Sequence, residues 1–118
     1  MSQDALQPQQ FGPEGKYTLQ QVGRRHVEAV HTNSGRRIGA MNWFSGNSGP
    51  GTVGVTTSAA GLPVDPAKPT IYKAIVSKPH RNKGVATRML EFARQIEPDL
   101  QHSHALSPDA VEWAKRHP

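Results

Sequence analysis

The stretch "VSKPHRNKGVATRML", residues 76–90, decides the fold that we predict for this chain. The residues just before it are β-branched and aromatic, as in a strand. After Gly84 the apolar residues recur at the spacing of one helix face, at Val85, Ala86, Met89, Leu90, Ala93 and Ile96. Pro98 ends this helix, because proline cannot continue the hydrogen-bond ladder. The stretch therefore predicts a strand that runs through a short basic turn into a helix.

The basic turn between these two elements predicts a binding site for an anion. A helix that begins at Gly84 leaves its first backbone N–H groups without partners, and the positive end of the helix dipole lies at the same place. Gly84 lets a ligand approach the backbone closely, while Arg81 and Lys83 add positive charge. Phosphate fits such a turn best. An ordinary strand-to-helix turn with solvated cations is the alternative that this short pattern leaves open.

Other segments of the chain also have the patterns of strands and helices. Residues 17–22 ("YTLQQV") and 25–32 ("RHVEAVHT") alternate apolar and polar residues, and residues 36–44 ("RRIGAMNWF") follow an "NSG" turn. Residues 70–76 ("TIYKAIV") form the strand that enters the basic turn. "SPDAVEWAKRH" predicts a last helix, with Ser107 as N-cap and Pro108 in the first turn. We predict an α/β domain of the α+β type, with a mostly antiparallel central sheet, a central helix and a C-terminal helix.

Two segments lack these patterns. Residues 1–15 are rich in Gln, Pro and Gly, which predicts a disordered N-terminal arm. Residues 45–69 are dominated by Gly, Ser, Thr and Pro, which predicts a long surface loop. The predicted domain thus spans residues 16–118, and a chain of 118 residues has room for only one.

Composition narrows the classes of function. No run of the sequence approaches the roughly 20 apolar residues of a membrane span, and no signal-peptide pattern opens it, so we expect a cytoplasmic protein. The absence of cysteine excludes disulfides and thiolate chemistry. The 14 Lys and Arg residues against 9 Asp and Glu residues give a basic surface that attracts anions. Nucleic acid is not the expected partner, because the arginine pairs 24–25 and 36–37 are typical of solvated strand ends and aromatic residues are few.

The segment "RNKGVA", residues 81–86, resembles motif A of the GNAT superfamily of N-acetyltransferases, which reads [RQ]-x-x-G-x-[GA] after the fourth strand of that fold. The hairpin over residues 25–44, with Gly39, is similar to the second and third strands of the family. The resemblance covers residues 17–118 and implies a minimal GNAT-like fold with acetyl coenzyme A as co-substrate. It implies that motif amides hold the pyrophosphate and that the preceding strand end lines the pantetheine arm. The implied cofactor-binding residues are Ile75, Val76, Ser77, Arg81, Asn82, Lys83, Gly84, Val85, Ala86 and Thr87.

The chain departs from the family pattern at several places. Pro79 stands one position later than the proline of the family's V-x-P, and His80 takes a slot that is commonly aromatic. The family's N-terminal helices and its two closing strands have no counterpart in the pattern of this sequence. "HSHALSPDAVEWA", residues 102–114, also resembles the ending of small GNAT-like proteins encoded by phages, which implies a phage source.

Acetyl transfer needs a neutral amine and a proton for the departing thiolate. The family often takes that proton from a tyrosine of its last helix, but the resemblance places Ala114 at that position. Our candidate catalytic residues are therefore Tyr72 and His104 as substitute acids and Glu28 as a base acting through water. Each also has a structural interpretation: a strand tyrosine with a wet hydroxyl, a surface histidine and a solvated strand carboxylate.

Three hypotheses for the function follow. The first is an acetyl coenzyme A-dependent N-acetyltransferase that modifies an amine of a small molecule or protein, in the host cytoplasm if a phage encodes it. The alternatives are a non-catalytic GNAT-like phage protein with a binding or virion-associated role, and a basic nucleic-acid-binding module. No metal site is predicted, because His102 and His104 lack a third ligand at suitable spacing. Unpaired strand edges in so short a fold would favour a homodimer.

Overall fold

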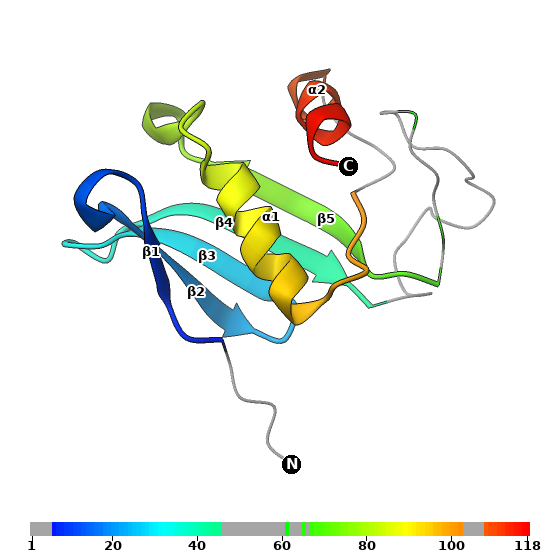
Figure 1. Cartoon of the computed structure of the whole chain (residues 1–118), viewed down its shortest axis with the longest axis horizontal. Coiled ribbons are helices and arrows are strands. Elements are labelled where there is room, and N and C mark those ends of the chain that lie inside the picture. The colour runs from blue at the N-terminus through cyan, green and yellow to red at the C-terminus, as the bar shows by residue number, and fades with distance from the viewer. Residues whose placement is uncertain (1–5, 46–60, 62–64, 66, 103–107) are drawn as a thin grey trace, which may run out of the picture.

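A computed structural model of the chain describes residues 6–45, 61, 65, 67–102 and 108–118. The strands are β1 (Gln9–Phe11), β2 (Tyr17–Gly23), β3 (His26–His31), β4 (Arg37–Phe44) and β5 (Thr70–Val76). The helices are α1 (Val85–Ile96) and α2 (Pro108–Arg116), with 3-10 turns at Pro13–Gly15 and Lys78–His80. Consecutive strands pair antiparallel in the order β1-β2-β3-β4-β5, and α1 lies across one face of this sheet (Figure 1). The predicted α+β class is therefore confirmed.

The strands predicted from the sequence occur as β2, β3, β4 and β5, with ends that differ by at most one residue. The "NSG" turn joins β3 to β4, and Gly35 there has a φ of 73°, which favours glycine. Its amide donates to the carbonyl of His31 at 2.8 Å. The predicted helix after the basic turn is α1, and the last predicted helix is α2.

The structure corrects the extent of the predicted N-terminal arm. Residues 9–11 form β1 and residues 13–15 form a 3-10 turn, although we expected this segment to be disordered. Pairing of β1 with β2 uses backbone hydrogen bonds, so it needs no apolar alternation, and one aromatic residue anchors it. Phe11 is buried against Tyr17, with 5.1 Å between the ring centroids. Most of the loop predicted over residues 45–69 lies outside the described residues.

The core lies between α1 and the sheet. Helix α1 buries Val85, Met89, Leu90, Phe92 and Ala93. They pack against sheet residues that include Leu19, Val27, Met41 and Trp43. Phe92 was missing from the predicted apolar stripe, although it is fully buried.

Gly39 lets α1 approach the sheet closely. A Cβ atom at this position would lie 3.2 Å from the carbonyl oxygen of Ile75 and 3.2 Å from Cε of Met89. Both distances are tighter than most Cβ contacts, so glycine leaves the room that the methionine side chain fills.

The chain turns back toward β5 after α1. Nε and Nη2 of Arg94 both donate to the carbonyl of Leu100, at 3.1 and 3.0 Å, which holds this return in place. Gln101 then pairs in parallel with Thr70 at the first residue of β5. Neither described helix has the length and apolar character needed to cross a membrane.

Candidate functional site

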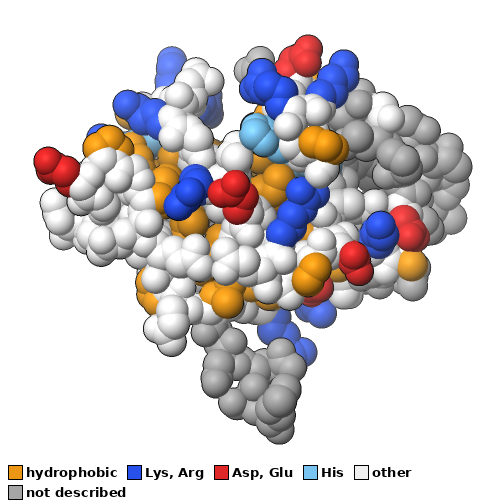
Figure 2. Space-filling model, in the orientation of Figure 1, with side chains coloured by type: hydrophobic (Ala, Val, Ile, Leu, Met, Phe, Trp, Pro, Cys, Tyr) orange, Lys and Arg blue, Asp and Glu red, His pale blue; other side chains and the backbone are white. Residues whose placement is uncertain are grey.

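A cleft of about 690 Å³ lies where β5, the basic turn, the start of α1 and helix α2 meet. Its wall on the β5, turn and α1 side contains seven residues predicted to bind the cofactor: Val76, Arg81, Asn82, Gly84, Val85, Ala86 and Thr87. His80 completes this side. The opposite wall comes from the C-terminal end of the chain, through Glu112, Trp113, Arg116 and His117. Figure 2 shows Lys and Arg side chains on both sides of the notch between the turn and α2.

The first turn of α1 presents bare backbone amides to this cleft. No side chain caps the helix, and its first backbone bond runs from the amide of Arg88 to the carbonyl of Gly84 at 3.0 Å. The amides of residues 84–87 consequently have no hydrogen-bond partner in the described part of the chain. Gly84 has a φ of 77°, and a Cβ atom added there would meet nothing within 4 Å. Backbone N–H groups, the helix dipole and open space therefore coincide.

Two side chains fix the turn between β5 and α1. Nε of Arg81 donates to the carbonyl of Val76 at 2.9 Å. The amide and hydroxyl of Ser77 both donate to the carbonyl of Ile38 in β4, at 2.7 and 2.9 Å. Ser77 is thus bound to the sheet, and its amide is not free for a ligand. Only Nε of Arg81 takes part in the bond to Val76, so the other guanidinium nitrogens have no partner in the described chain and can reach a ligand in the cleft.

His80 connects the cleft with the sheet. Its Nδ1 lies 2.9 Å from the hydroxyl of the buried Tyr17, and the two rings meet edge to face. Partial burial lowers the pKa of His80 below its usual value, and the cations of Lys16 and Lys83 lower it further. His80 is therefore mostly neutral at neutral pH, with Nδ1 held by the tyrosine and Nε2 without a partner in the described chain.

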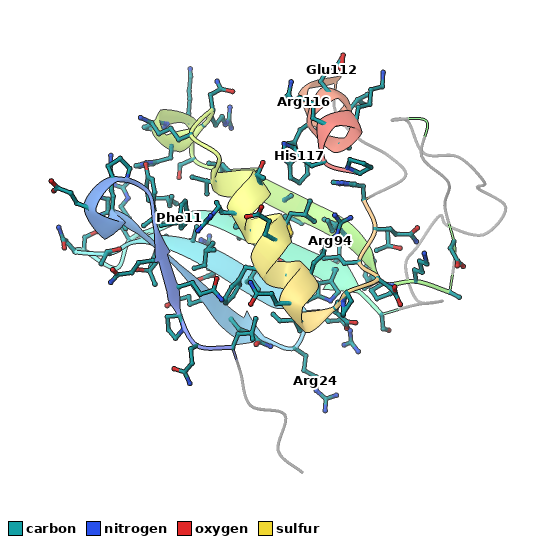
Figure 3. The ribbon with its side chains drawn as sticks, in the orientation of Figure 1. Phe11, Arg24, Arg94, Glu112, Arg116 and His117 are labelled. Atoms are coloured by element: carbon teal, nitrogen blue, oxygen red, sulfur yellow. The ribbon has the colours of Figure 1, made fainter. Side chains whose placement is uncertain are left out.

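A small polar cluster holds α2 against the start of α1. Nε1 of Trp113 donates to the hydroxyl of Thr87 at 2.9 Å, and Nε2 of His102 lies 2.6 Å from the carbonyl oxygen of His117. The rings of His102 and Trp113 meet edge to face with 5.0 Å between centroids. Burial lowers the pKa of His102 although its bond to the carbonyl opposes the shift, so this histidine is neutral with its proton on Nε2. Figure 3 shows Glu112 and Arg116 on α2 and His117 just after it, with His117 on the side of α2 toward α1.

One edge of β5, next to the cleft, has almost no strand partner among the described residues. The amide of Ile71 donates to the carbonyl of Gln101 at 2.9 Å, and the amide of Gln101 donates to the carbonyl of Pro69 at 2.9 Å. Beyond this single bridge no described strand pairs with that edge of β5. Within the described part of the chain, β5 therefore has an unpaired edge that leads toward the basic turn.

The predicted catalytic residues do not come together in the cleft. Tyr72 lies on the sheet face away from α1, stacked on Phe44 with 4.2 Å between ring centroids. Glu28 is on the same face, with Oε2 3.3 Å from Nε2 of His26 and 3.4 Å from Nη1 of Arg37. His104 lies outside the described residues. Of the predicted cofactor residues, Ile75, Ser77 and Lys83 do not line the cleft. The described residues contain no group of three or more side chains placed to hold a metal ion.

Sequence reasoning missed the wall that α2 contributes. Trp113 and His117 are four residues apart, so they share a helix face, and both meet Thr87. The four-residue spacing could have predicted that both side chains lie on one face of α2. Only the tertiary structure shows that this face packs against the start of α1. No protein-family model, curated protein or solved structure matches this chain.

Proposed function

We propose that this chain is an acetyl coenzyme A-dependent N-acetyltransferase of minimal GNAT-like fold that acetylates an amine of a small molecule or protein. The observation that carries the proposal is the uncapped start of α1, where the amides of residues 84–87 face a basic cleft without partners in the described chain. Such a group of amides favours a phosphate or diphosphate.

The residues of the cleft suit this ligand in charge and size. Its described lining residues include Arg81 and Arg116 and one carboxylate, that of Glu112. A volume of about 690 Å³ lies inside the range of sites that bind small molecules and cofactors. We assign the pyrophosphate to the amides of residues 84–87, with both arginines neutralising its charge.

The free edge of β5 suits the pantetheine arm, which carries two amide groups. An extended chain with amides can add to a strand edge through main-chain hydrogen bonds. The edge beyond Ile71 is open in the described chain, and Val76 belongs to the cleft lining. The arm would thus run along β5 away from the basic turn.

When bound, acetyl coenzyme A supplies an activated acetyl group, and the chain supplies position and proton transfer. His80 is the described lining residue best suited to take a proton from the acceptor amine. For this step the proton of neutral His80 is on Nδ1 and is donated to the Tyr17 hydroxyl, which leaves the lone pair of Nε2 to accept the amine proton. His80 then returns this proton to the thiolate that leaves when the C–S bond breaks. Tyr72 and Glu28 lie away from the cleft, so we give them no part in this step.

Coenzyme A itself provides the first test. Native mass spectrometry of the purified protein and calorimetry with coenzyme A are expected to show one saturable site per chain. Steady-state assays with a panel of amines then measure thioester consumption. No binding of coenzyme A in either measurement would refute the proposal.

A second candidate is a non-catalytic protein of the same fold, with a binding or virion-associated role in a phage. The position of Tyr72 and Glu28 outside the cleft favours it. This candidate predicts coenzyme A binding without turnover on any amine. A homodimer through the open strand edges also remains a prediction, which sedimentation of the purified chain can test.

A further inference from the structure

A second hollow, separate from the cleft, lies on the sheet side away from α1. It measures about 410 Å³ and is bordered by Arg24 and Arg25 of the β2–β3 turn and by Asn42, Phe44 and Tyr72 of the neighbouring strands. The described residues that line it include no carboxylate. The proposed acetyl transfer uses none of these residues.

The aromatic part of the hollow is built by an irregularity in the pairing of β4 and β5. Trp43 pairs with Ile71 and Asn42 pairs with Lys73, so Tyr72 is an extra residue on β5. Such a bulge re-aims a side chain. The Tyr72 ring stacks on Phe44 at 4.2 Å and 28°, and the residue remains 50% exposed. A half-exposed, immobilised ring is a platform for a planar ligand.

The polar part of the hollow has unused donors. Neither guanidinium group of Arg24 and Arg25 has an ion pair or hydrogen bond within the described chain. The side-chain amide of Asn42 has no hydrogen bond there either.

We propose that this hollow binds a nucleotide unit of a single-stranded nucleic acid. The base stacks on Tyr72, Asn42 contacts its edge, and Arg24 and Arg25 hold the adjacent phosphates. The volume suits one nucleotide rather than a groove for many. The unpaired cations and the lack of carboxylates match a phosphate backbone, and Lys73 extends this positive charge along β5.

Fluorescence anisotropy with labelled ten-nucleotide single strands tests the proposal. We expect Tyr72→Ser to weaken binding roughly 5- to 100-fold, the effect of one lost base stack, and Tyr72→Phe to leave it unchanged. Arg24→Ala should weaken binding. It should also make the slope of log K against log salt concentration less steep by about 0.7, the change expected for one lost phosphate contact. Arg36→Ala, which removes the same charge near the far end of β4, is the matched control and should cost less.

Three outcomes would overturn the proposal. An abasic strand of equal charge that binds as tightly excludes stacking. Equal losses for Arg24→Ala and Arg36→Ala indicate general charge attraction. Loss of oligonucleotide binding in Gly84→Glu places the ligand in the cleft instead. Competition with adenosine monophosphate gives a further test. Weak displacement supports the polynucleotide site, whereas efficient displacement indicates a site for a free nucleotide and is a fourth outcome that overturns the proposal. Circular dichroism confirms that each variant is folded.

Discussion

Substitutions at Gly84 separate the effect of backbone strain from the effect of charge at the proposed pyrophosphate site. Gly84 has a φ of 77°, and a Cβ atom there would meet nothing within 4 Å. Gly84→Ala therefore adds strain without a clash, and we expect it to lower the free energy of unfolding by about 1–2 kcal/mol. Gly84→Gln and Gly84→Glu carry the same strain and a longer side chain into the cleft, and they differ from each other only in charge.

The charge effect follows from distance. A glutamate carboxylate at residue 84 can lie about 6 Å from a phosphate on the α1 amides, which costs about 3 kcal/mol at an effective dielectric constant of about 20. That energy corresponds to a loss of about 100-fold or more in affinity at low salt. Added salt should narrow the difference between the Glu and Gln variants.

The assays are urea denaturation for the strain and calorimetry with coenzyme A at two salt concentrations for the charge. We expect Gly84→Ala to bind coenzyme A most tightly, Gly84→Gln less tightly and Gly84→Glu most weakly. Equal affinity of the Gln and Glu variants would show that the anion does not bind at these amides. An unchanged free energy of unfolding in Gly84→Ala would contradict the strain argument separately.

Other parts of the structure give predictions of their own. Trp113→Phe removes the hydrogen bond to Thr87 and should lower the free energy of unfolding by about 1 kcal/mol, measured by urea denaturation. In a Thr87→Val background the same substitution should not cause this loss. Burial lowers the pKa of His102 in the folded state, so the unfolded chain binds this proton more readily. His102 therefore has no effect on the pH dependence of stability well above its unfolded pKa of about 6.5, and stability falls as the pH drops through that value. His102→Asn should flatten this fall between pH 7.5 and 5.5, and an identical slope would contradict it. Gly39→Val should cost about 1–3 kcal/mol, more than Gly39→Ala, because the side chain collides with Met89, and Tm values rank the two.

Local patterns predicted most elements of this fold. Alternation identified β2 and β3, the "NSG" turn identified β4, and β-branched and aromatic residues identified β5. The 3.6-residue period with Gly84 and Pro98 identified α1. These signals succeed because each element buries one face against a single core. Strand β1 was missed because its pairing depends on backbone groups, which every sequence has, and on Phe11 alone.

The candidate site was predicted only in part. The basic turn was identified because its residues are contiguous in the sequence. The second wall comes from α2, more than 20 residues away, and depends on which partner Trp113 finds, here Thr87. The face of Glu28 could not be assigned either, because a strand alternates sides and only the register with β4 decides which one meets α1.

The absence of a side chain at Gly39 also sets where the proposed site stands. The Met89 side chain lies against Gly39, and Met89 is five positions after Gly84, about 7.5 Å along the helix axis. The missing methyl group at Gly39 therefore sets how closely the start of α1 packs against the sheet. A side chain at residue 39 would push α1 away from the sheet and move the amides of residues 84–87 relative to β5. A substitution outside the cleft would thus displace the proposed anion site.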